Sequence, residues 1–190
     1  DFPDWEEKKL GHIGKFKSGV GFSTSEQGGN EGIPFFKVSD MNLFGNEVNM
    51  TTSNNKVTNA QISSLGFKPI VNDSIIFAKV GAAIFLERKR IAKDFLIDNN
   101  MMAFIPGEGN INFFKYLFDS IRLSKYAQVG ALPSYNGSDL ATIKVGLPSI
   151  KEQWKIKKFL SSIDSHLELL DTQINKSKTW KKGLLQKMFV

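Results

Sequence analysis

Residues able to do covalent or metal chemistry are few in this sequence. It has no cysteine and two histidines, His12 and His166, which are not spaced as metal ligands. The carboxylates of Asp4, Glu6 and Glu7 are too close in sequence to converge on one metal ion as the carboxylates of nucleases do. There is no phosphate-binding G-x-x-x-x-G-K-[S/T] loop, and no Asn/Asp-Pro-Pro-aromatic tetrapeptide of the kind that methylates exocyclic base amines. The sequence therefore predicts a binding protein and not a catalyst, with no metal or cofactor of its own.

Binding chemistry is concentrated in three segments that we expect to be exposed: Lys17 to Thr24, Lys79 to Arg90, and Ser134 to Ser138. The first and third are rich in glycine and small polar residues, and Tyr135 offers a flat face. The second ends in the densest basic cluster outside the C-terminal stretch. Such side chains can contact phosphates and base edges, although three adjacent cations are more often a solvated surface. The candidate DNA-binding residues are Lys17, Ser18, Thr24, Lys79, Arg88, Lys89, Arg90, Ser134, Tyr135 and Asn136.

The charge distribution does not by itself indicate a nucleic-acid partner. The net charge is +6, but residues 150–190 hold nine of the lysines against four acids, which leaves residues 1–149 close to neutral. Any DNA contact by residues 1–149 must therefore come from local patches. A protein partner for these residues is the alternative that their near-neutral charge favours.

The first 147 residues have the pattern of an α+β domain with several short strands and two helices. We expect an edge strand or short helical turn over residues 5–16. Thr58 and Gln61 predict a capping box, with Gly66 at the end of the same helix. The remaining patterns predict strands at 33–38, 74–79, 82–87, 95–97, 101–105 and 143–147, helices at 58–65 and 112–125, and loops at 17–32, 42–55 and 129–139.

The C-terminal stretch after Pro148 predicts one long helix. Ser149 and Glu152 form a capping box at its start. Apolar residues then follow a 3.5-residue repeat, the period of a coiled-coil seam. Ser177 and Lys181 complete this repeat as its two polar members. The apolar seam residues are Ile156, Leu160, Ile163, Leu167, Leu170, Ile174, Leu184 and Met188.

A helix of this length would extend roughly 60 Å, at about 1.5 Å per residue. An exposed seam of that length requires a partner helix, which predicts pairing of two chains. Packing of the helix on its own domain is the alternative. Gly183 could also end the straight helix early, leaving residues 184–189 as a separate turn.

Several motifs resemble the specificity subunits of type I restriction–modification enzymes. LPSIKEQWKIKKFLSSID (147–164) and KKGLLQKMF (181–189) resemble the helical conserved region of that family. The opening WEEKKLGHIGKFKSG (5–19), IPFFKVSDM (33–41), VNDSIIFAKVGAAI (71–84) and GALPSYNGSDLATIKVGLP (130–148) resemble their target-recognition domains.

The resemblance implies a non-catalytic chain with a DNA-binding target-recognition domain over 1–147 and a spacer helix over 148–190. It implies that two such helices pair as an antiparallel coiled coil. The implied partners are double-stranded DNA, a second half-subunit in a homodimer, modification subunits that use S-adenosylmethionine, and restriction subunits that use ATP. The alternative is a coiled-coil adaptor whose head binds protein and not DNA.

With one recognition domain and one helix, the chain corresponds to half of such a subunit. Its first residue is Asp and not Met, so we expect either a fragment of a longer chain or a half-length subunit. No apolar run approaches the roughly 18 residues of a membrane span. A reducing, cytoplasmic setting is the one that we expect.

Overall fold

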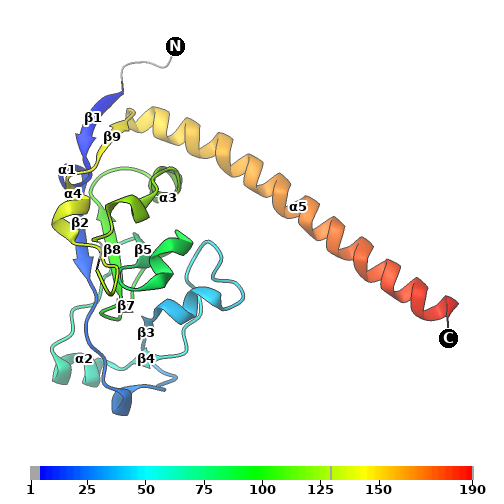
Figure 1. The fold of residues 1–190 in the computed structure, drawn as a ribbon, viewed down its shortest axis with the longest axis horizontal. Helices are drawn as coiled ribbons and strands as arrows, with labels where there is room; N and C mark the ends of the chain where they lie inside the picture. The colour runs from blue at the N-terminus through cyan, green and yellow to red at the C-terminus, as the bar shows by residue number, and fades with distance from the viewer. Residues whose placement is uncertain (1–4, 129, 190) are drawn as a thin grey trace.

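The computed structural model describes residues 5–128 and 130–189, so the expectations for Asp4 and Val129 lie outside the described residues. Figure 1 shows a head of short strands and helices from which one long helix, α5, projects. The long helix leaves the head beside β1 and β9, and its far end lies well away from the head. This is the predicted α+β class with a long C-terminal helix. The structure contains one chain, so pairing of α5 with a second helix stays a prediction.

A four-stranded antiparallel sheet forms the centre of the head, in the order β2-β8-β5-β6. Both β2 and β5 pair antiparallel with β8, so they run in the same direction and end at the same edge of the sheet. Side chains alternate between the two faces, and this alternation separates Ile75 and Phe104 on one face from Ile76 and Ala103 on the other. The strands are β2 (Gly14–Ser18), β5 (Ser74–Ala78), β6 (Lys89–Ala92) and β8 (Met101–Pro106).

Helices and a two-stranded sheet cover the first face. Phe104, Phe114 and Phe118 are fully buried there, and the ring centroids of Phe104 and Phe118 are 4.7 Å apart. Burying each such ring contributes about 1.5–3 kcal/mol, so this cluster is the main core of the head. The covering elements are α1 (Leu10–Ile13), α3 (Ile111–Ser120), α4 (Gly137–Ala141), the 3-10 helix η4 (Leu123–Tyr126), and the antiparallel pair β1 (Glu6–Lys9) with β9 (Lys144–Leu147).

The second face packs against a smaller three-stranded sheet in the order β4-β3-β7. Phe36 and Ile97 contribute to the cluster between the two sheets, whereas Phe35 and Leu96 point the other way into a third cluster. These elements are β3 (Ile33–Phe36), β4 (Lys56–Val57), β7 (Leu96–Ile97), α2 (Asn59–Leu65), and the 3-10 helices η1 (Thr24–Glu26) and η2 (Val38–Asn42).

The long helix α5 (Ile150–Met188) is attached to the head only through its first turns. Its N-cap Ser149 accepts a hydrogen bond from the Glu152 backbone N–H. Ile156 packs against the main core, and the Trp5 indole donates to Glu152 at 3.1 Å. Farther along, the Tyr116 hydroxyl donates to Asp164 Oδ2 at 2.6 Å. After Asp164, every described residue of the helix is exposed except Gly183, which is half-buried.

Most of the predicted elements are present, and two predictions are wrong. The capping box of α2 is confirmed, with Gly66 left-handed at φ 65. Residues 82–86 form a 3-10 helix, η3 (Ala82–Leu86), and not a strand, because the chain turns at Gly81 with φ 82. The predicted helix over 112–125 ends at Ser120, because Ile121 is extended. Gly183 does not end α5, and β6 was not predicted.

Candidate nucleic-acid interface

Residues from all three predicted binding segments meet at one edge of the central sheet. Because β2 and β5 end at the same edge, Ser18 and Lys79 lie together, and the Lys79 ammonium donates to Ser18 Oγ at 3.3 Å. The Tyr135 N–H donates to the Lys79 carbonyl at 2.9 Å, which brings in the segment around Ser134. The Lys79 N–H in turn donates to the Asn100 carbonyl at 2.7 Å. The polar residues of this edge that are exposed or half-buried form a surface that we call the sheet-end surface. Its members are Ser18, Lys79, Asn100, Ser134 and Asn136.

Gly19 allows the chain to leave β2 at this edge. A Cβ atom at Gly19 would meet the Asp98 carbonyl oxygen at 1.8 Å, which is backbone that cannot move aside alone. The Gly19 N–H also donates to the Met101 carbonyl at 3.2 Å. A glycine is therefore required for the close approach that places Ser18 beside the start of β8.

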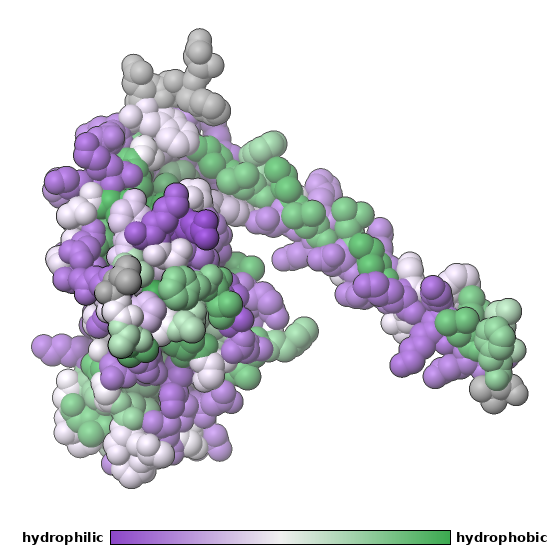
Figure 2. Space-filling view, in the orientation of Figure 1, coloured by the Kyte–Doolittle hydropathy of each residue, from purple (hydrophilic) through white to green (hydrophobic). Residues whose placement is uncertain are grey.

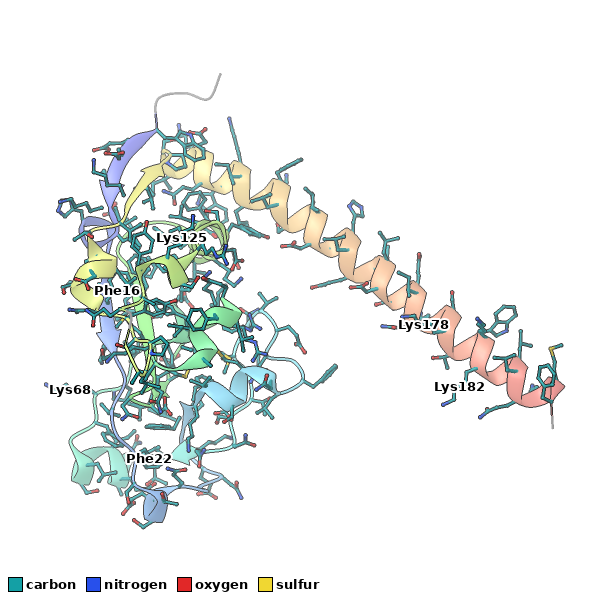
Figure 3. All side chains as sticks on the ribbon, in the orientation of Figure 1. Phe16, Phe22, Lys68, Lys125, Lys178 and Lys182 are labelled. Carbon is teal, nitrogen blue, oxygen red and sulfur yellow. The ribbon has the colours of Figure 1, made fainter. Side chains whose placement is uncertain are left out.

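Lys17 and Thr24, the other two candidates of the first segment, lie away from the sheet-end surface. The side chain of Lys17 lies on the opposite face of β2 from the side chain of Ser18. The Lys17 ammonium donates to the Lys68 carbonyl at 2.8 Å. Burial lowers the pKa of Lys17, and the nearby charge of Lys68 lowers it further. Thr24 is exposed in η1, after Phe22, whose ring lies 4.3 Å from that of Phe35. Figure 3 shows Phe22 and Lys68 toward the end of the head opposite the start of α5.

Lys89 is buried, so the expectation that the whole basic cluster is exposed is wrong. Only 3% of its side chain is accessible, and its ammonium donates to Glu87 at 2.6 Å and to the Ile121 carbonyl at 2.9 Å. Burial alone would raise the pKa of Glu87, but hydrogen bonds from Lys89 and Ser124 outweigh it and lower that pKa below its ordinary value. Lys89 therefore holds η3, β6 and the end of α3 together.

The other two cations of the cluster lie closer to solvent, and they bind the end of η2 and the turn that follows it. The Arg88 guanidinium donates from Nη1 to Asn42 Oδ1 at 2.6 Å. Arg90 donates from Nε to the Asn46 carbonyl at 2.7 Å. Burial lowers the pKa of Arg90, and the positive charge of Arg88 adds to this effect. The two guanidinium groups thus form a local cationic cluster on a head of nearly neutral charge, with Asp119 and Glu47 as nearby acids that partly offset these effects on Arg90.

Tyr135 is also buried, and the expectation of an exposed flat face is wrong. Its side chain is 3% accessible, and its ring meets that of Phe77 edge-on at 6.1 Å. Burial raises the pKa of Tyr135 above its ordinary value. It anchors the loop that presents Ser134 and Asn136, and Asn136 Oδ1 caps α4 by accepting from the Ser138 N–H.

The predicted seam of α5 forms an apolar stripe that changes character along the helix. Ile156 packs on the main core and Leu160 is half-buried. The later seam residues face solvent, and Figure 2 shows apolar side chains along one side of the helix, interrupted by polar ones before its far end. The distal half also carries the exposed Lys178 and Lys182 (Figure 3). The exposed seam residues are Ile163 at 41%, Leu167 at 54%, Leu170 at 52%, Ile174 at 49%, Leu184 at 38% and Met188 at 72%.

Sequence reasoning missed two features of the site. Asn100 joins the sheet-end surface, and its only sequence signal was the Asn99-Asn100 turn dipeptide before β8. Asp40, within η2, and Asn46, after it, are fully buried in one polar network, whereas the sequence indicated only a turn-rich loop over 42–55. No sequence signal could have found this burial, because it depends on partners elsewhere in the fold.

Two further observations concern only residues 5–128 and 130–189. No three histidine, aspartate or glutamate side chains in these ranges lie where they could share a metal ion. None of the described helices is both long enough and apolar enough to cross a membrane.

Comparison with known proteins gives a consistent family. A family model described as "Type I restriction modification DNA specificity domain" matches residues 3–178. A chain from a structural study of complex assembly in the type I R-M system is similar over 90% of this chain, with a TM-score of 0.68 and 16% identity. The HsdS subunit from Thermoanaerobacter tengcongensis is similar over 90% of this chain, with a TM-score of 0.67 and 20% identity.

The S subunit of a type I restriction–modification system from M. genitalium is similar over 88% of this chain, with a TM-score of 0.60 and 16% identity. The match covers 41%, 40% and 41% of those three chains, so this chain spans about two fifths of their length. At these identities the likeness shows a shared fold, and the family model assigns membership. The chain belongs to the family of type I restriction–modification DNA specificity domains.

Proposed function

We propose that this chain is a non-catalytic DNA-recognition half-subunit that reads one half of a two-part DNA site. The observation that carries the proposal is the division between a head with a polar sheet-end surface and a helix with an unpartnered apolar stripe. Loops and strand ends on a rigid scaffold are where base-reading side chains belong. The functional boundary in this proposal falls between residues 147 and 148.

The second part of the proposal concerns α5. Two copies of the helix pair antiparallel, which places two heads at a fixed separation on either side of a two-fold axis. A helix of 39 residues extends roughly 60 Å at about 1.5 Å per residue, so such a pair acts as a spacer. Family membership supports modification subunits that use S-adenosylmethionine, and restriction subunits that use ATP, as further partners. The setting of this assembly is the cytoplasm.

Methylome sequencing of cells with and without this chain tests the proposal directly. We expect a two-part methylated adenine motif to disappear when the chain is removed and to return when it is restored. An unchanged methylome, together with no salt-dependent binding of duplex DNA by the purified chain, would contradict DNA recognition.

Substitutions at Arg88 and Arg90 then distinguish phosphate binding from base reading. If either guanidinium binds a phosphate, its replacement by alanine weakens binding to all duplexes and reduces the salt slope by about 0.9. If it binds a base edge instead, the replacement costs about 1–3 kcal/mol on the cognate duplex alone. Lys93→Ala is the control, because Lys93 is an exposed cation outside the candidate set.

A protein-binding adaptor is the second candidate function, because residues 1–149 carry almost no net charge. This candidate predicts that the purified chain forms its helix pair but does not shift duplex DNA at any salt concentration. The methylome comparison then shows no change.

A further inference from the structure

An isolated aromatic side chain stands out on the head. Phe44 is 95% exposed, whereas six other phenylalanines, at positions 35, 36, 95, 104, 114 and 118, are at most 1% exposed. It occupies the tip of the turn Leu43–Gly45, which follows η2, and Gly45 takes the left-handed φ of 87. Figure 1 shows the segment after η2 protruding from the head on the side over which α5 extends. An exposed Phe at a loop tip gains nothing from the fold of this chain.

The turn is held rigidly by a buried polar network. Asn46 is fully buried, its side-chain amide donates to the carbonyls of Asp40 and Thr52, and its Oδ1 accepts from the Thr51 and Thr52 N–H groups. The network continues through Asp40, which is also fully buried and accepts from the Lys37 N–H and from Asn54. Fully satisfied buried networks specify one conformation. The exposure of Phe44 is therefore imposed by the fold and is not the result of a loose loop.

Two guanidinium groups flank the same turn. Arg88 binds the Asn42 side chain on one side of Phe44, and Arg90 binds the Asn46 carbonyl on the other. A guanidinium carries five N–H donors. The bonds within the described chain use Nη1 of Arg88, and Nε and Nη1 of Arg90, so each retains donors for a ligand. Two acids, Asp119 and Glu47, act on Arg90 and partly offset the effects that lower its pKa. Glu47 belongs to the turn itself, where it accepts from the Gly45 N–H at 3.2 Å.

This combination fits DNA better than it fits a protein. The two segments that flank Phe44 in the chain, at Asn42 and Asn46, each bind a guanidinium group, so cationic groups lie near the turn. DNA offers flat apolar base faces next to a row of phosphates, which matches one aromatic ring between two guanidinium groups. Apolar wedges that partly unstack a base step are an established way to bind and bend a duplex.

We propose that Phe44 is a wedge that stacks against a base step of the duplex while Arg88 and Arg90 contact the flanking phosphates. The proposal rests on the proposed function, because it names a contact within DNA recognition. The segment 48–50 runs along β6, the outer strand of the sheet, with the Met50 N–H donating to the Ile91 carbonyl at 2.8 Å. The wedge thus lies beside the sheet and adds a second point of contact to the sheet-end surface.

The test uses the full chain assembled with its modification subunits, on duplexes that carry the methylated motif found in cells. The adenine analogue 2-aminopurine, placed at successive positions, reports unstacking by a rise in fluorescence. We expect one position to brighten with the unmodified chain and to stay dark with Phe44→Ala. The affinity of Phe44→Ala should fall about 5- to 100-fold, as expected for removal of one base–aromatic stack.

Phe44→Trp should retain both the affinity and the fluorescence rise, because it keeps a flat ring. Val71→Ala is the matched control for removal of an exposed apolar side chain, since Val71 is 61% exposed. All three variants should have the melting temperature of the unmodified chain, because neither Phe44 nor Val71 contributes to the core. A lower melting temperature for Phe44→Ala would overturn the view that the fold does not use this ring.

The outcomes separate the wedge from the proposed function. Equal binding and equal fluorescence for Phe44→Ala and the unmodified chain would overturn the wedge and leave DNA recognition intact. Weaker assembly of Phe44→Ala with the modification subunits, at unchanged DNA affinity, would make the turn a protein anchor and also overturn the wedge. If the unmodified assembly does not prefer the motif, the proposed function fails first and the wedge fails with it.

Discussion

In the head, apolar side chains converge on three buried clusters, whereas on α5 they lie in a stripe that faces solvent over most of the helix. The head also carries a buried polar network around Asp40 and Asn46, in which the Asn46 side chain donates to the Asp40 carbonyl and accepts from the Thr51 N–H. The head therefore buries most of its large apolar side chains within this chain. The sequence of α5 is regular enough to predict a helix, but its apolar side requires a surface that this chain does not supply.

The change from buried to exposed apolar side chains occurs within α5 and not at its start. Gln153, at 1% exposure, and Ile156 belong to the head in terms of packing. Asp164 makes the last hydrogen bond to the head, through Tyr116. The seam inferred from the 3.5-residue repeat thus serves two surfaces, because its first member packs on the head and its later members remain for a partner.

Breaking the exposed part of the seam should have the largest effect. Leu167→Asp places a charge on the stripe, at a position that is 54% exposed in the single chain and that we expect to be buried in the proposed helix pair. An uncompensated buried charge costs about 3–5 kcal/mol, so we expect the pair to dissociate into folded monomers in sedimentation experiments. Ser165→Asp introduces the same charge on the opposite side of the helix and should leave the pair intact. A monomeric unmodified chain at micromolar concentration would remove the basis of this prediction.

Removing a buried ion pair of the head should lower the stability of the fold and leave helix pairing unchanged. Lys89→Met leaves Glu87 without its buried partner, and the expected cost is about 3 kcal/mol, the lower end for a broken buried pair, because Glu87 remains a quarter exposed. Chemical denaturation should show this decrease while helix pairing is unchanged. Lys93→Met, the same substitution at an exposed position, should have almost no effect.

The pH dependence of Lys89→Met gives an additional check. The folded pKa of Glu87 is lowered, so the stabilisation from this carboxylate is present above its ordinary value of 4.5 and is lost as pH falls through the folded pKa. Removing Lys89 removes one cause of the lowered pKa. The difference in stability between the two proteins should therefore shrink under acidic conditions, and a constant difference would contradict the assigned pair.

The contrast between head and helix also explains how much the sequence could predict. Local patterns sufficed for α5, whose repeat needs no knowledge of distant residues, and for α2, whose Thr58 and Gln61 are three positions apart. The strands β5 and β8 were recognisable from their apolar runs. The segment 82–86 was misassigned because a short apolar run fits a strand as well as a 3-10 turn with one buried residue, Ile84.

The sequence could predict which segments contribute to the candidate site, but not which of their residues meet in space or which are buried. Ser18 and Lys79 meet because β2 and β5 both pair with β8, a relation that no local pattern contains. The burial of Lys89 depends on a carbonyl 32 positions away, at Ile121. Both errors in the candidate set, Lys89 and Tyr135, have this long-range origin.

The polar members of the seam allow a finer adjustment of the helix pair. Ser177 and Lys181 are exposed in the single chain, and buried polar groups in a seam favour one register at some cost in stability. Ser177→Leu combined with Lys181→Leu should raise the melting temperature of the pair and broaden its cross-linking pattern. An unchanged melting temperature and pattern would indicate that the helices have diverged before this point and that Lys181 is simply solvated.

The smallest effect is expected for the hydrogen bond between Tyr116 of the head and Asp164 of α5. Tyr116→Phe removes the hydrogen bond to Asp164, which is worth about 1 kcal/mol or less for a solvent-accessible pair. Global stability should hardly change, but hydrogen exchange should quicken in α5 between Ile156 and Asp164. Tyr126→Phe is the control, because Tyr126 is 43% exposed and lies in η4, outside the contact with α5.

The same bond should respond to alkaline pH in the unmodified chain. Burial, followed by the acceptor carboxylate of Asp164, raises the pKa of Tyr116 from 10.0 to about 12. A raised pKa means that the phenol form is favoured in the folded state, so its stabilisation is complete below 10.0 and is lost as pH rises through about 12. Spin-label distances between the head and the middle of α5 should broaden over this range in the unmodified chain. They should already be broad at neutral pH in Tyr116→Phe, and identical distributions in both proteins at every pH would show that packing of Ile156 alone orients the helix.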